Sequence, residues 1–161
     1  MKKMNSRGFT LVELLAVIVV LAIIMVFAVP AIMGTMNNAK KSAFKAYANK
    51  VLNLAAAKYE GDNMMNTLPA ALAGTITGAT RAYCYTLSEL ELTTTGGYTG
   101  YAIVALDANA KPTYYVTLRD NSFSVENRSY SALEKVDTYG VGNTTAAACP
   151  TGTGAITVTA N

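Results

Sequence analysis

The stretch Gly8-Phe9-Thr10-Leu11-Val12-Glu13 places one carboxylate directly before twenty consecutive apolar or proline residues, 14–33. No ionisable side chain occurs from residue 14 to residue 39, a run of 26 residues. A helix needs only about 20 apolar residues to cross the roughly 30 Å of hydrocarbon in a bilayer. The sequence therefore predicts that this segment enters a membrane.

Glu13 is the residue that this prediction leaves to be explained, because an acidic side chain deep in hydrocarbon costs up to about 3 kcal/mol on insertion scales. One interpretation is that Glu13 lies at the level of the lipid headgroups. Another is that it stabilises the first turn of a helix through the helix dipole. A third is that it has a charged partner.

The residues that precede this stretch are polar and include Lys2, Lys3 and Arg7, as in the amino-terminal region of a targeting signal. One interpretation is a secretory signal peptide cut near the Val-Pro-Ala sequence at residues 29–31, and another is a plain single-span anchor. An apolar stretch of twenty residues exceeds the roughly 7–15 expected of a signal peptide, which favours the anchor. Neither interpretation explains Glu13.

The basic leader followed by Gly8-Phe9-Thr10-Leu11-Val12-Glu13-Leu14-Leu15 resembles the prepilin signature of type IV pilins and related pseudopilins. The resemblance implies that residues 1–8 are a leader peptide. A prepilin peptidase would cut after Gly8 and then methylate the new amino terminus at Phe9. The resemblance also implies that Glu13 pairs with the terminal amine of a neighbouring subunit.

Processing of this kind changes the charge of the chain. The full sequence has 13 Lys and Arg residues against 10 Asp and Glu residues, and three of the basic residues lie in the leader. The mature chain is therefore formally neutral, which weakens an interpretation as a nucleic-acid binder. Lys40, Lys41, Lys45 and Lys50 remain clustered, either on a solvated helix face or at lipid headgroups, or in contact with neighbouring subunits or DNA.

A helical pattern continues beyond the apolar segment and predicts one helix over residues 9–60. Its first part, 9–36, is the membrane-spanning or filament-core segment, and its second part, 37–60, is amphipathic. A stripe at three- and four-residue intervals is predicted to pack on a globular head; its members are Ala43, Tyr47, Val51 and Leu54. Pro30 removes one helical hydrogen bond and Gly34 loosens the next turn, so we expect a kink or local melting there.

Residues 61–161 are predicted to form the globular head. Gly61 is suited to end the helix in a left-handed cap, and an irregular connection with short helical pieces at 68–72 and 88–92 follows. Short segments rich in Tyr, Val, Ile and Thr predict an antiparallel meander, with strands at residues 98–106, 113–118 and 122–126 and one more at 155–159. A long helix across a small antiparallel sheet is an α+β fold, which is also the head architecture that the resemblance implies.

Two cysteines, Cys84 and Cys149, lie in this head. An extracellular location permits a disulfide between them, and two unpaired buried thiols are the other interpretation. The chain has no histidine, which excludes Ser-His-Asp and Cys-His catalysis and histidine-ligated metals. We therefore predict no catalytic, metal or cofactor site. Asn127-Arg128-Ser129 and Asn143-Thr144-Thr145 fit the glycosylation acceptor pattern, which is weak evidence in a bacterial-type protein.

For function, the resemblance implies a structural subunit of a type IV pilus that forms a homo-oligomeric surface filament for adhesion, motility or cell-cell contact. The alternatives are a pseudopilin or minor pilin of a type II secretion or DNA-uptake machine and, less favoured, a singly anchored or secreted binding domain. The implied partners are the prepilin peptidase, minor pilins and an assembly platform; no head ligand is implied. Before assembly, the chain would cross the cytoplasmic membrane once with its amino terminus inside, and after assembly it would lie at the cell surface.

Overall fold

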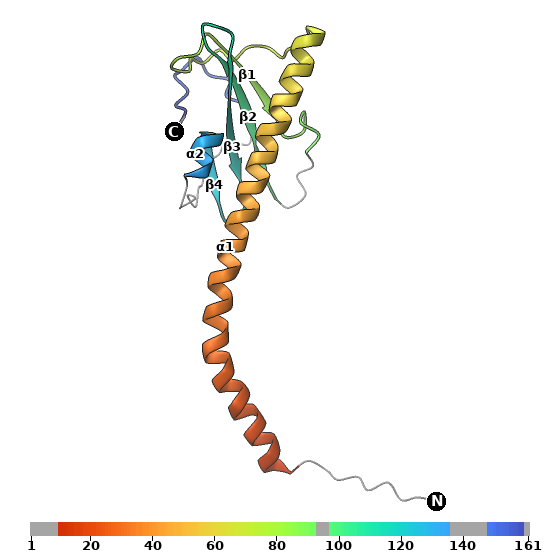
Figure 1. Ribbon diagram of the computed structural model, residues 1–161, viewed down its shortest axis with the longest axis vertical. Coiled ribbons are helices and arrows are strands. Elements are labelled where there is room, and N and C mark those ends of the chain that lie inside the picture. Colours follow the sequence, from red (N-terminus) through yellow and green to blue (C-terminus); the bar gives the residue numbers. More distant parts are fainter. Residues whose placement is uncertain (1–9, 93–96, 136–147, 160–161) are drawn as a thin grey trace, which may run out of the picture. The chain divides into compact units, whose positions relative to one another are not determined.

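The computed structural model describes residues 10–92, 97–135 and 148–159. Its elements are one long helix, four strands and one short helix: α1 (Leu11–Met65), β1 (Arg81–Thr86), β2 (Thr99–Leu106), β3 (Pro112–Arg119), β4 (Ser124–Ser129) and α2 (Tyr130–Glu134) (Figure 1). The chain divides into two compact units, Met1–Lys40 and Lys41–Asn161, and each is described by itself below. Helix α1 contributes residues to both units.

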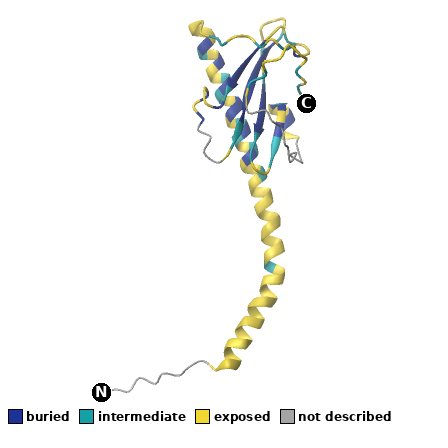
Figure 2. Ribbon diagram, turned by 180° about the vertical axis from the view of Figure 1, so that it is seen from behind, coloured by how far each residue is buried: buried dark blue, intermediate teal, exposed yellow. Residues whose placement is uncertain are grey.

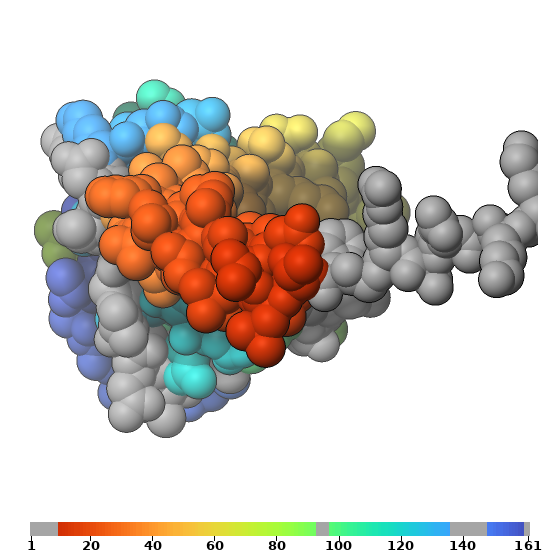
Figure 3. All heavy atoms as spheres, turned by 90° about the horizontal axis from the view of Figure 1, so that it is seen from below, coloured from red at the N-terminus to blue at the C-terminus, as the bar shows by residue number. Residues whose placement is uncertain are grey.

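The described part of the first unit is an exposed apolar helix. Its large apolar side chains from Leu11 to Met36 are between 48% and 81% exposed, and the spheres of Figure 3 show those near the start of α1 on an open surface. The helix continues through Pro30 and Gly34 without interruption, so local melting is absent here, and the kink stays a prediction. The hydroxyl of Thr35 donates to the carbonyl of Ile32 at 2.9 Å, so this polar group is satisfied by the helix itself.

In the second unit, one face of α1 is buried (Figure 2). The buried positions recur at three- and four-residue intervals, as expected for an amphipathic helix, and are Phe44, Ala48, Val51, Leu52, Ala55, Tyr59 and Asp62. Three members of the predicted stripe pack on the core, because Val51 is buried and Tyr47 and Leu54 lie against it partly buried. Ala43 is exposed, so the prediction is wrong at that residue. The helix is rotated so that the large ring of Phe44 packs beside Tyr98 and Phe123.

The end of α1 also differs from the prediction. Gly61 lies inside the helix, and Asn66 adopts the left-handed conformation that ends it, with φ of 55°. The N–H of Thr67 donates to the carbonyl of Asp62 at 2.8 Å, as in a Schellman motif. Apart from Gly, Asn is among the residues that adopt the left-handed conformation most readily, so Asn66 is a usual residue for this cap. Gly61 was the stronger signal in the sequence.

The four strands form an antiparallel meander in the order β1-β2-β3-β4, which confirms the predicted α+β fold. The sequence prediction missed β1. The segment 68–72 is not helical, residues 87–91 form a hydrogen-bonded turn, and residues 155–159 form two isolated bridges rather than a strand. Gly100 in β2 leaves no room for a side chain, because a Cβ there would clash with the carbonyl oxygen of Thr117 and its φ of 154° disfavours other residues.

The sheet has an apolar core on each face. On one face, β-strand residues such as Tyr85, Val104 and Leu118 pack with the buried face of α1. On the other face, Cys84 and Ile103 pack with Ile76 and with the carboxy-terminal segment around Ile156. The second unit is therefore built in three layers, with the helix, the sheet and the irregular segments stacked in that order.

Candidate functional site

The first candidate site is the start of α1, where Thr10 and Glu13 form a capping box. The backbone N–H and the hydroxyl of Thr10 donate to Oε2 of Glu13 at 2.9 and 2.8 Å. In return, the N–H of Glu13 donates to Oγ1 of Thr10 at 3.3 Å. Two N–H groups that a helix start otherwise leaves unsatisfied are thereby paired. This arrangement fixes the helix start one residue after Thr10.

Thr10 is a functional residue that the sequence interpretation missed, although the signal was present. The pattern Thr-x-x-Glu directly before an apolar run is the usual signature of a capping box. The sequence offers three interpretations of Glu13: a place at the lipid headgroups, a role in the helix dipole, or a charged partner. The structure adds a fourth, the capping box with Thr10. Gly8 and Phe9, the predicted cleavage and methylation residues, lie outside the described residues.

The apolar part of α1 is the second component of this site. In the described part of the chain, α1 is the one helix long and apolar enough to cross a membrane, and its most apolar window has no buried residue. An apolar surface of this size is far larger than the patches that soluble monomers expose. This surface fits a segment that anchors the chain in a membrane.

One of the lysines that follow the apolar segment forms an ion pair within the fold. Nζ of Lys45 lies 2.7 Å from Oε2 of Glu134, so it joins α1 to α2 inside the second unit. Lys40 and Lys50 are exposed. Because one of its charges is paired within the fold, the cluster offers less positive charge to lipid headgroups or DNA than the sequence suggests.

The two cysteines and Asn127, the first residue of one glycosylation acceptor pattern, are bonded within the fold. Cys84 and Cys149 are bonded as a disulfide that closes a separation of 65 residues and holds the carboxy-terminal segment to β1. Asn127 is 6% exposed and its Nδ2 donates to the carbonyl of Thr157 at 3.0 Å. A buried, hydrogen-bonded amide is not available for glycosylation in the folded chain; Asn143 lies outside the described residues.

A polar pocket of about 370 Å³ lies beside the end of α1. Its lining includes an ion pair between the exposed Lys58 and the buried Asp62, in which Nζ is 3.1 Å from Oδ1, and the 2% exposed Tyr85. The Tyr85 hydroxyl makes no hydrogen bond within the described residues. Burial and then the charge of Asp62 raise the pKa of Tyr85. Among all the described residues of the chain, no group of three or more His, Cys, Asp or Glu side chains could hold a metal ion.

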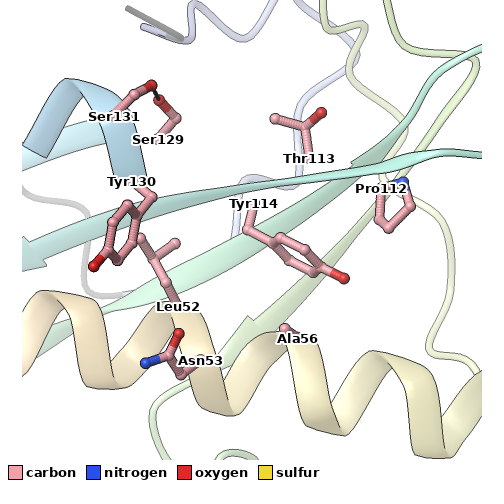
Figure 4. Close-up of a pocket in the computed structure, with 9 residues that line it drawn as sticks. All are labelled: Leu52, Asn53, Ala56, Pro112, Thr113, Tyr114, Ser129, Tyr130 and Ser131. Atoms are coloured by element: carbon pink, nitrogen blue, oxygen red, sulfur yellow. Dashed lines mark hydrogen bonds between the residues drawn. The ribbon is translucent and has the colours of Figure 1, made fainter.

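A groove of about 500 Å³ lies between α1, the start of β3 and the junction of β4 with α2 (Figure 4). The rings of Tyr114 and Tyr130 extend toward α1, whose Leu52 and Ala56 form the facing wall. Pro112 also lines the groove. The groove is mostly apolar, as binding pockets in proteins usually are.

Comparison with known proteins identifies only the amino-terminal part of the chain. Residues 3–29 match the family model described as the prokaryotic N-terminal methylation motif. No curated protein and no solved structure matches the chain. The match supports a type IV pilin-like or pseudopilin-like precursor that a prepilin peptidase processes and a membrane anchors before assembly. It points to a structural protein rather than to an enzyme.

Proposed function

We propose that this chain is the structural subunit of a type IV pilus, which polymerises through α1 into a surface filament used for adhesion, motility or cell-cell contact. The observation that carries the proposal is a methylation motif that runs directly into an uncovered apolar helix. Such a helix is stable in lipid before assembly. In a filament, the same side chains would be covered by the helices of other copies.

The proposed assembly contact uses the charge that processing creates. Cutting the bond between Gly8 and Phe9 produces a cationic amine, and Glu13 supplies the opposite charge on a neighbouring copy. In a water-poor helix bundle such a pair is strongly attractive, and leaving one member unpaired typically costs about 3–5 kcal/mol. The pair therefore favours one register between copies.

The capping box is compatible with this pairing. The cut leaves the peptide bond between Phe9 and Thr10 intact, so the N–H of Thr10 still has Oε2 of Glu13 as its acceptor. An ionised carboxylate has lone pairs for several donors. Glu13 therefore holds its own helix start and receives a neighbour's amine with the same group.

Mass analysis of filaments sheared from the cell surface tests the proposal. We expect an abundant chain that begins at methylated Phe9. A processed chain that is scarce in or absent from filaments would instead indicate a pseudopilin or a minor pilin. A chain that begins at Met1 or Ile32 would contradict pilin-like processing altogether.

A pair of variants at Glu13 separates its two roles. Glu13→Gln keeps an oxygen acceptor for the Thr10 N–H but removes the charge, whereas Glu13→Lys reverses the charge and removes the acceptor. We expect both variants to be cut after Gly8 and neither to assemble normally. Normal filaments from Glu13→Gln would show that Glu13 acts through the capping box alone, and normal filaments from Glu13→Lys would refute both roles.

A further inference from the structure

The second unit exposes few large apolar side chains. Among its described residues these are Met64, Met65 and Tyr130, which are 88%, 67% and 54% exposed. Tyr130 lines the groove between α1, β3 and α2, whereas the methionines lie in the last turn of α1, outside that groove. The unit therefore carries two separate apolar features. The projection is formed by Met64 and Met65, and the recess is the groove between α1, β3 and α2.

The recess suits methionine. Its volume of about 500 Å³ is ample for one or two long side chains. The rings of Tyr114 and Tyr130 face Leu52 and Ala56 across it, and polar residues complete the lining together with Pro112: Asn53, Thr113, Ser129 and Ser131 (Figure 4). Methionine is unbranched and flexible, so it fills irregular apolar gaps and makes favourable contacts with aromatic rings. Nothing in the described part of the chain fills this volume.

The projection cannot enter the recess of its own chain. Ala56 and Met64 stand eight residues apart on the same helix, which is about 12 Å at the rise of an α-helix. A second copy displaced by about that distance along α1 would bring its Met64 level with Ala56 of the first. Because the two surfaces are different, such a contact repeats from copy to copy and does not close on itself.

The charges at the two surfaces are complementary. The last turn of α1 contains no basic residue, so the partial negative charge at the carboxy-terminal end of the helix dipole is not offset. Lys111 is exposed and directly precedes Pro112, which lines the groove. The same displacement brings the negative helix end of one copy toward Lys111 of the other.

We propose that the groove between α1, β3 and α2 is the docking site for Met64 and Met65 of a second copy of this chain. This inference rests on the proposed polymer and adds a contact between the second units to the pairing at Glu13. It also gives the exposed Tyr130 a specific role as one wall of that contact.

Cross-linking between two distinguishable copies tests the contact. One full-length copy carries Met64→Cys and a first tag, and the other carries Tyr130→Cys and a second tag. We expect a covalent species containing both tags in sheared filaments after mild oxidation. The matched control replaces Tyr130→Cys by Thr77→Cys, an exposed site on the loop that precedes β1, and is expected to give no such species.

The outcomes distinguish this inference from the function on which it rests. Filaments without the mixed species, or with equal cross-linking in the control, overturn the docking site and leave the pilus subunit intact. A chain that forms no filaments in its native assembly system overturns both proposals.

A second pair of variants avoids cysteine chemistry. Because Met64 and Met65 are exposed in the single chain, changing both to Asp is expected to leave the chain folded, although negative charge at the carboxy-terminal end of a helix slightly destabilises that helix. Loss of one buried methionine contact is expected to weaken each subunit contact about tenfold or more. We expect the double Asp variant to form fewer filaments, and we expect those filaments to dissociate at a lower temperature than wild-type filaments. The double variant Met64→Leu, Met65→Leu is the control and is expected to behave as the wild type. Filaments of unchanged stability from the Asp variant would contradict the docking site.

Discussion

Glu13 and Thr10 bind each other through both their side chains and their backbones. The Oε2 atom of Glu13 receives the N–H of Thr10 at 2.9 Å and its hydroxyl at 2.8 Å. An acid at the edge of an apolar helix is therefore already occupied before any second copy is present. This contact gives the carboxylate a defined position, and a defined position lowers the entropic cost of meeting a partner.

Removing the hydroxyl of Thr10 is expected to loosen the start of α1. Thr10→Val has nearly the same shape but loses two of the three hydrogen bonds, which at a helix start is worth about 0.5–2 kcal/mol. We expect the amide of Glu13 to exchange hydrogen about two- to thirtyfold faster in detergent micelles, as measured by NMR. Thr10→Ser keeps the hydroxyl and serves as the control; equal exchange in all three chains would contradict the capping box.

The disulfide is expected to contribute a large share of the stability of the second unit. It closes a separation of 65 residues, and the chain-entropy model assigns about 4 kcal/mol to a loop of that length. Replacing both Cys84 and Cys149 by Ala should lower the free energy of unfolding by roughly this amount in denaturant titrations. Reductant should destabilise the wild type and leave the double variant unchanged, and an insensitive wild type would argue against the bond.

Tyr85 is expected to make the second unit sensitive to alkaline pH. Burial and Asp62 raise the pKa of Tyr85 in the folded chain, whereas an unfolded tyrosine has a pKa of about 10. The unfolded chain therefore releases its proton first. The stability that this tyrosine contributes is fully present below about pH 10 and is lost as the pH rises toward the folded pKa.

The measurement is the free energy of unfolding from about pH 8 to pH 11.5. We expect the free energy of unfolding of Tyr85→Phe to decline less steeply above about pH 10 than that of the wild type. At pH 7 the variant should be neutral or slightly more stable, because the hydroxyl makes no hydrogen bond within the described residues. Tyr130→Phe is the matched control at an exposed tyrosine, and identical slopes for the wild type and Tyr85→Phe would refute the prediction.

Asn127 is expected to anchor the carboxy-terminal segment. Its Nδ2 donates to the carbonyl of Thr157 at 3.0 Å, and its Oδ1 accepts from the hydroxyl of Thr117 at 2.9 Å. Its φ of 45° also disfavours most other residues. Asn127→Ala should cost about 2–4 kcal/mol and speed hydrogen exchange of the Thr159 amide. Asn109→Ala, in the exposed β2–β3 turn, should do neither.

The fold prediction succeeded where the local pattern was decisive. The long apolar run, the amphipathic spacing that follows it and the short segments rich in Tyr, Val, Ile and Thr predict a long helix and an antiparallel meander, because each of these signals lies in consecutive residues. The prediction missed β1, although this strand pairs with the next strand along the chain. The six residues of β1, Arg-Ala-Tyr-Cys-Tyr-Thr, are identified as a strand by their pairing with β2 and their burial in the fold.

The same division applies to the candidate sites. By itself, the sequence determined the membrane-type helix and the motif around Gly8 and Glu13, because consecutive residues carry both. Only the tertiary structure decided which face of α1 is buried, that Asn127 is buried and bonded to Thr157, and that Tyr130 lines a groove. Each of these depends on packing between elements from distant parts of the chain, and free energy is gained only when those elements meet. The pattern of apolar residues therefore fixes the elements, whereas their shared core fixes the surfaces that remain.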